Sequence, residues 1–128
     1  MGIMGVETNW YSYCVQLGDN PAAYGPFECQ EASYEDTWKY CVECGIAPKL
    51  LAACGMTPSV VMPDRSILIY NLRFAALMCR MFFARFKECL PEPDDYTGFA
   101  NLHKLRYNTS GGSTDLEKST LIFKEVCA

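Results

Sequence analysis

The chain has 128 residues, of which half are hydrophobic and a fifth are charged, and its net charge at pH 7 is −4. The composition argues against a disordered chain, which lacks apolar residues, and against a nucleic-acid-binding protein, which needs a basic face to displace counterions. A single histidine leaves little general acid–base chemistry near neutral pH. The length fits one domain, residues 1–128, and its unusual feature is eight cysteines.

The N-terminal region, residues 1–43, is predicted to contain short helices separated by turns. Thr8 can cap a helix over residues 9–17, which a glycine then ends. A second helix is expected over residues 26–44, where aromatic residues recur at helical spacing. A proline suited to a first helical turn predicts a third, short helix over residues 47–54.

Residues 64–90 contain neither glycine nor proline and predict one long helix of ~40 Å. Asp64 is a suitable N-cap, and Pro91 stops the helix. Its main polar stripe consists of four basic residues: Arg65, Arg73, Arg80 and Lys87. A membrane span would bury two arginines at ~2.5–3.5 kcal/mol each near the bilayer centre, so the helix is better suited to lie against protein or flat on an anionic surface.

The tail, residues 91–128, is expected to be irregular. Residues 94–98 and 108–113 are rich in turn-forming residues and are predicted to be loops. His103 is expected to be a loop residue in a small basic patch. No phosphate-binding loop, serine nucleophile motif or paired-carboxylate arrangement is present in the sequence.

A capping box predicts one last helix near the C-terminal end. Thr114 and Glu117 form this box, and the helix would run to Cys127. The alternative for residues 119–126 is a strand. The predicted fold is all-α: a small disulfide-stapled helical hairpin over residues 44–90, with additional short helices and an irregular C-terminal tail.

Two pairs of cysteines share one spacing. Cys44 and Cys54 are separated by nine residues, and so are Cys79 and Cys89. Ten positions along a helix give ~15 Å of rise and end about 80° short of full register, so both thiols of a pair lie on the same side. Two antiparallel helices with this spacing can be joined at two levels, Cys44 to Cys89 and Cys54 to Cys79.

This pattern resembles the twin C-x9-C family, the coiled-coil-helix–coiled-coil-helix (CHCH) proteins of the mitochondrial intermembrane space. Each motif in that family has an apolar or aromatic residue seven positions after its first cysteine, as Leu51 and Phe86 are here. The resemblance covers residues 44–89. It implies import without a cleaved presequence, and residues 1–10 have neither the basic n-region nor the apolar h-region of a signal peptide.

The other cysteines leave alternatives open. Cys14 and Cys29 could bridge the first two helices, and the partners of Cys41 and Cys127 stay undetermined. Cys41 and Cys44 also have the C-x-x-C spacing of a redox-active dithiol, but such a dithiol lies at a helix start, whereas this pair is expected at a helix end. A zinc site would need four ligands, usually as two close pairs, and the sequence has one such pair.

The predicted function is non-catalytic: an accessory subunit of a mitochondrial respiratory-chain complex, docked on its intermembrane-space side, as the resemblance implies. The expected partners are larger protein subunits and anionic lipid head groups; no cofactor, metal, nucleic acid or small-molecule substrate is expected. The expected interface side chains are those of the long helix: Phe82, Phe83, Phe86, Arg65, Arg73, Arg80 and Lys87. Two alternatives are a thiol-disulfide oxidoreductase or assembly factor using Cys41 and Cys44, and a reduced structural protein of a particle such as a virion.

Overall fold

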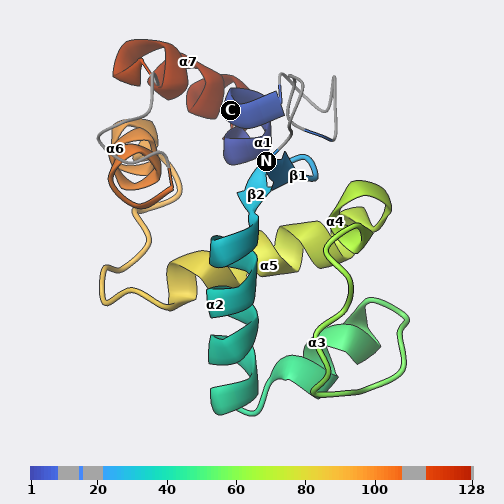
Figure 1. The fold of residues 1–128 in the computed structure, drawn as a ribbon. Coiled ribbons are helices and arrows are strands. Elements are labelled where there is room, and N and C mark those ends of the chain that lie inside the picture. The colour runs from blue at the N-terminus through green and yellow to red at the C-terminus, as the bar shows by residue number, and fades with distance from the viewer. Residues whose placement is uncertain (9–14, 16–21, 108–114, 128) are drawn as a thin grey trace.

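The computed structural model describes residues 1–8, 15, 22–107 and 115–127, and these are mostly helical (Figure 1). The elements in chain order are α1 (Gly2–Thr8), β1 (Ala23–Tyr24), β2 (Cys29–Gln30), α2 (Glu31–Glu43), α3 (Ala47–Ala53), α4 (Ile67–Tyr70), α5 (Leu72–Ala84), α6 (Tyr96–Arg106) and α7 (Leu116–Cys127). The two short strands form an antiparallel hairpin in which Tyr24 pairs with Cys29. The predicted all-α class is confirmed.

The helices form two groups that face each other (Figure 1). In the terminal layer, made from both ends of the chain, α7 packs against α1 and α6. In the central layer, α5 packs against α2, α3 and α4. The hairpin and the segment between α5 and α6 connect the two layers, so residues far apart in the sequence meet at their junction (Figure 1).

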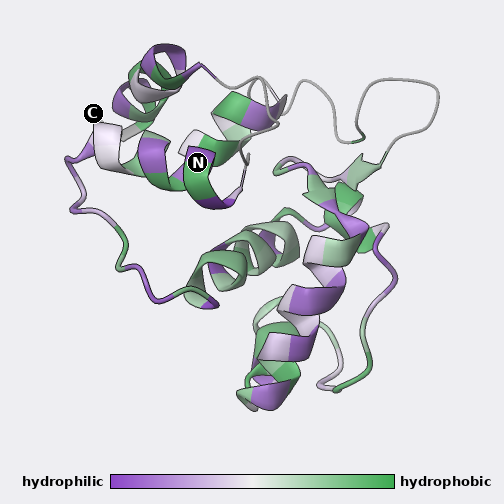
Figure 2. Cartoon of the chain, turned by 60° about the vertical axis from the view of Figure 1, so that its left-hand side comes forward, coloured by the Kyte–Doolittle hydropathy of each residue, from purple (hydrophilic) through white to green (hydrophobic). Residues whose placement is uncertain are grey.

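Helix α5 supplies much of the hydrophobic core. It is apolar along most of its length, whereas α2 alternates between polar and apolar residues (Figure 2). Phe74 of α5 is fully buried, and its ring centroid lies 6.4 Å from that of Tyr34 and 6.3 Å from that of Trp38, both on α2. Aromatic pairs at such distances add to the stabilisation that burial provides, and they fix α2 against α5.

The prediction of one helix over residues 64–90 is wrong, because the chain breaks the helix at Asn71. The backbone there has φ −110° and ψ 86°, and the side-chain oxygen accepts a hydrogen bond from the Phe74 N–H at 3.0 Å. Asn71 is therefore the N-cap of a new helix. Asp64 accepts from the Ser66 N–H at 2.9 Å in the turn before α4, and α5 ends at Ala84.

The N-terminal predictions need two corrections. The helix expected over residues 26–44 begins only at Glu31, since Gly25 (φ 79°) and Glu28 (φ 46°) have left-handed backbone and form the hairpin turn. Thr8 ends α1, and its hydroxyl proton is shared between the Met4 and Pro26 carbonyls, each 3.0 Å from Oγ1. The helix expected over residues 9–17 lies outside the described residues, except for position 15, which bridges to the hairpin.

The tail contains one helix more than the sequence predicted. α6 begins after Asp95, whose side chain accepts from the Gly98 N–H at 2.8 Å, so the loop predicted over residues 94–98 is wrong. The last predicted helix is confirmed as α7, and the strand alternative is excluded. Asp115 accepts from the Glu117 N–H at 2.9 Å at its start. Residues 108–113 lie outside the described ranges.

Candidate docking surface

The segment between α3 and α4 has no regular secondary structure, but its backbone is fixed to α2. The Trp38 Nε1–H donates to the Val60 carbonyl at 3.1 Å, and the Tyr34 hydroxyl donates to the Pro63 carbonyl at 2.8 Å. Both aromatic rings are buried in the core. The backbone of residues 60–63 is therefore anchored at both ends to rigid parts of the molecule.

Three consecutive apolar side chains are exposed on this anchored segment. Val60, Val61 and Met62 have 60%, 73% and 39% of their surface exposed. Full burial of such a side chain is worth ~1.5–3 kcal/mol, and a contiguous exposed apolar group is typical of an interaction surface. We name residues 60–62 the apolar edge.

Carboxylates flank the apolar edge. A groove of about 380 Å³ separates the start of α2 from the linker, and its lining includes Glu31, Glu35, Met62 and Asp64. Hydrogen bonds from Ser66 hold the pKa of Asp64 below its usual range, so this carboxyl is ionised at neutral pH. The apolar edge thus has an acidic rim.

One basic residue, Arg65, lines this groove together with the three carboxylates. Its guanidinium lies 4.1 Å from the centroid of the Tyr24 ring and donates to the Ala22 carbonyl at 2.9 Å. Its positive charge also helps to lower the pKa of Asp64. Because one cation faces three carboxylates, the rim keeps an acidic character.

Two of the three aromatic residues predicted as interface residues lie in the chain's own core. Phe82 and Phe83 are 8% and 9% exposed, and their ring centroids lie 5.0 and 5.8 Å from that of Tyr107. Phe86 is half-buried, with its ring 5.3 Å from Phe82. As a correction to the expected interface, Phe82 and Phe83 stabilise the junction between the two layers and are not available at the surface.

The predicted basic stripe is divided among several elements. Arg73 and Arg80 are exposed on α5, Arg65 precedes α4, and Lys87 follows the end of α5. Arg73 donates to the Ala53 carbonyl at 3.1 Å, at the end of α3. Because α4 and α5 are separate helices, the regular spacing of these residues does not place them on one continuous helical face.

The six cysteines with described side chains all have free thiols. They are Cys29, Cys41, Cys44, Cys54, Cys79 and Cys89. Cys44 and Cys89 are exposed, whereas Cys79 is buried. Burial raises the pKa of Cys79 to about 12 and that of Cys29 to about 11, and the charge of Cys29 adds to the shift at Cys79. The pairings Cys44–Cys89 and Cys54–Cys79 stay predictions, and Cys14 lies outside the described residues.

The C-x-x-C pair lies at the C-terminal end of α2. Cys41 is buried, and Cys44 is the exposed C-cap residue. Burial raises the pKa of Cys41 to about 11, and the neighbouring Cys44 adds to the effect. A reactive dithiol needs a thiol of low pKa, which a helix C-terminus disfavours. This position therefore does not favour thiol-disulfide exchange.

Within the described ranges, no helix has both the length and the apolar character that crossing a bilayer requires. The same part of the chain contains no group of three or more histidine, cysteine or acidic side chains arranged to hold a metal ion. Comparisons with protein-family models, with curated proteins and with solved structures found no match for this chain.

Proposed function

We propose that this chain is a non-catalytic accessory subunit that docks on a larger protein through the apolar edge. The observation that carries the proposal is the anchored exposure of Val60, Val61 and Met62. A free linker could turn these side chains inward, but the hydrogen bonds from Trp38 and Tyr34 hold the backbone in place. A partner that covers the edge removes apolar surface from water without having to order the segment first.

The acidic rim indicates the chemistry of the partner. Glu31, Glu35 and Asp64 line the groove beside the apolar edge. A complementary surface would present an apolar depression flanked by lysine or arginine, since opposite charges around an interface set its orientation and speed association. The partner is therefore a protein with a basic, apolar-centred docking site.

The resemblance to the twin C-x9-C family gives this proposal a location. It implies a larger subunit of a respiratory-chain complex on the intermembrane-space side, where disulfides Cys44–Cys89 and Cys54–Cys79 would form. The buried Cys41 at a helix end makes the oxidoreductase alternative less favourable.

The free thiols of the six described cysteines support a second candidate function. In a reducing compartment, the buried Cys41 and Cys79 would act as small hydrophobic residues in the core. The chain would then be a structural protein of a particle such as a virion, and the apolar edge would contact a neighbouring particle protein.

A double substitution of the edge tests the docking role. Val60→Ser with Val61→Ser, introduced into cells that produce the protein naturally, should shift the chain from a large species to the monomer on native gels. The matched control is Leu105→Ser with Leu121→Ser, which removes two leucines of the terminal layer that are 61% and 67% exposed. If both double variants stay in the large species, or both leave it, the edge is not the docking site.

A further inference from the structure

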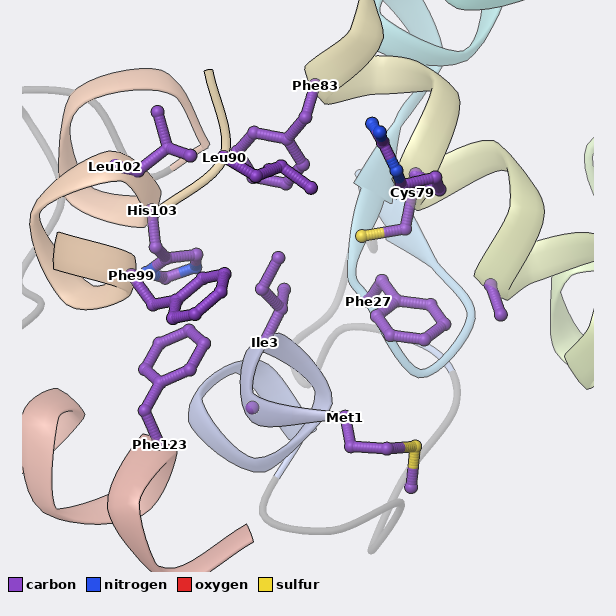
Figure 3. Close-up of a pocket in the computed structure, with 13 residues that line it drawn as sticks. Met1, Ile3, Phe27, Cys79, Phe83, Leu90, Phe99, Leu102, His103 and Phe123 are labelled. Carbon is purple, nitrogen blue, oxygen red and sulfur yellow. The ribbon is translucent and has the colours of Figure 1, made fainter. Parts of the chain in front are cut away.

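A cavity of about 420 Å³ lies where the terminal layer meets α5 (Figure 3). Its lining is mainly apolar, with buried side chains from both layers and the hairpin turn, Phe27, Cys79, Phe83 and Phe123, and the half-buried Phe99. Ala76, Arg80 and Leu90 also line it and are exposed, so the cavity has a route to solvent. Small-molecule sites of ~300–1,000 Å³ are built in this way, from apolar walls and a few polar groups.

One polar side chain, that of His103, is buried in the wall of this cavity. It is 1% exposed, and Figure 3 shows its ring among Ile3, Phe99 and Phe123. Its Nε2 lies 2.6 Å from a carboxylate oxygen of Glu7 on α1. Its Nδ1 is buried and has no hydrogen-bond partner among the described groups. The prediction of a loop residue is wrong for His103, which belongs to the buried face of α6.

The charges near His103 limit the kind of ligand. Glu7 contacts its Nε2, and Glu28 interacts with Glu7 in turn. The basic side chain of the lining, Arg80, is exposed to solvent, which screens its charge. An anionic head group next to the ring would face the two carboxylates, which disfavours a carboxylic acid there. A hydroxyl group can either donate to Nδ1 or accept from it, so it satisfies this atom in either protonation state of the ring.

We propose that this cavity binds a small uncharged alcohol with an apolar chain, whose hydroxyl group hydrogen-bonds to Nδ1 of His103. The chain lies against the aromatic lining, and the exposed side of the cavity at Ala76 and Leu90 admits the ligand. This site shares no residue with the apolar edge, so it stands or fails independently of the proposed docking role.

Titration of the full chain with 1-octanol, followed by NMR of ¹⁵N-labelled histidine, tests the assignment. His103 is the only histidine, so the Nδ1 resonance is unambiguous. We expect saturable binding that shifts this resonance. Octane should bind without the shift and about three- to tenfold more weakly, since it lacks one hydrogen bond. No saturable binding of octanol, or tighter binding of octanoate, would overturn the proposal.

Two matched substitutions locate the binding site without disturbing the core. Ala76→Trp fills the exposed side of the cavity, and Ala52→Trp adds the same side chain at an exposed position of α3 outside it. We expect Ala76→Trp to weaken octanol binding by about tenfold or more and Ala52→Trp to change it by less than about twofold. Equal affinities in the two variants would place octanol elsewhere and contradict the proposal.

Discussion

At the residue scale, the least expected feature is a set of polar groups at the junction of the two layers. Glu7, Glu28 and His103 come from α1, the hairpin turn and α6. Burial raises the pKa of Glu28 to about 7, and the charge of Glu7 and a hydrogen bond with it add to the effect. Periodicity could not predict this set, because its members are up to 96 positions apart.

Glu28→Gln should change how stability depends on pH. Unfolded Glu28 has a pKa near 4.5, and the folded state raises it to about 7. Between these values the folded state holds a proton that the unfolded state has lost, so the free energy of unfolding falls as pH rises through this window. The glutamine of the variant does not titrate, so its free energy of unfolding does not fall for this reason. Relative to the natural chain, the variant should therefore be about 1 kcal/mol more stable at pH 8 than it is at pH 5. This figure allows for solvent screening of a half-buried group.

Urea unfolding of both proteins at pH 5 and pH 8 measures this difference. Glu43→Gln, at an exposed position of α2, is the control and should shift stability equally at both pH values. A constant difference between Glu28→Gln and the natural chain at the two pH values would show that the Glu28 carboxyl does not titrate in this window.

At the element scale, short-range signals predicted the helices whose ends they mark. The start of α3 follows from its proline, and a capping box of Thr114 and Glu117 predicts α7. The hydrogen bond described at the start of α7 goes to Asp115. The prediction of one long helix was wrong at Asn71, because this residue caps a new helix although no glycine or proline interrupts the apolar run. The same capping signal, Asp95 three residues before Gly98, could have found α6. Local capping hydrogen bonds therefore set the helix boundaries that hydrophobic periodicity did not predict.

Gly25→Ala tests how the hairpin packs on α4. Gly25 has φ 79°, and an added Cβ would lie 2.6 Å from the Leu68 carbonyl oxygen, which belongs to the backbone. The variant incurs both left-handed strain and a backbone shift, and we expect a loss of about 2–4 kcal/mol. Gly45→Ala is the matched control, because Gly45 has φ 68° and open space around its Cα. Its free energy of unfolding, measured for both variants by urea denaturation, should fall by only about 1–2 kcal/mol. Equal losses would mean that the hairpin moves freely away from α4.

At the scale of the whole molecule, the two layers meet through contacts that join distant parts of the chain. The Tyr107 hydroxyl donates to the Phe27 carbonyl, and Tyr107 also stacks on Phe83. Within the central layer, the Tyr40 hydroxyl donates to the Ala84 carbonyl at 3.1 Å and joins the ends of α2 and α5. The sequence correctly indicated an all-α chain, but it could not indicate that both of its ends form one layer, because hydrophobic periodicity reports only which side of a helix is buried.

The state of the cysteines decides between the two proposed settings of this molecule. Alkylation of the unfolded, non-reduced protein isolated from its natural source, followed by mass spectrometry of its peptides, measures that state. Bridges Cys44–Cys89 and Cys54–Cys79 are the expected result for an intermembrane-space subunit. Each should contribute ~2–4 kcal/mol, so a reductant should lower the melting temperature of the natural chain.

Alkylation of the thiols in the folded protein tests the alternative, a chain with reduced cysteines. If the thiols are reduced, the exposed Cys44 and Cys89 should react first, whereas the buried Cys41 and Cys79 should react only after unfolding, because burial raises the pKa of each. A reductant would then leave the melting temperature unchanged.

Eight free thiols would contradict the twin C-x9-C pairing and favour the particle protein. A bridge between any other two cysteines, such as Cys29 and Cys79, would contradict that pairing while still placing the chain in an oxidising compartment.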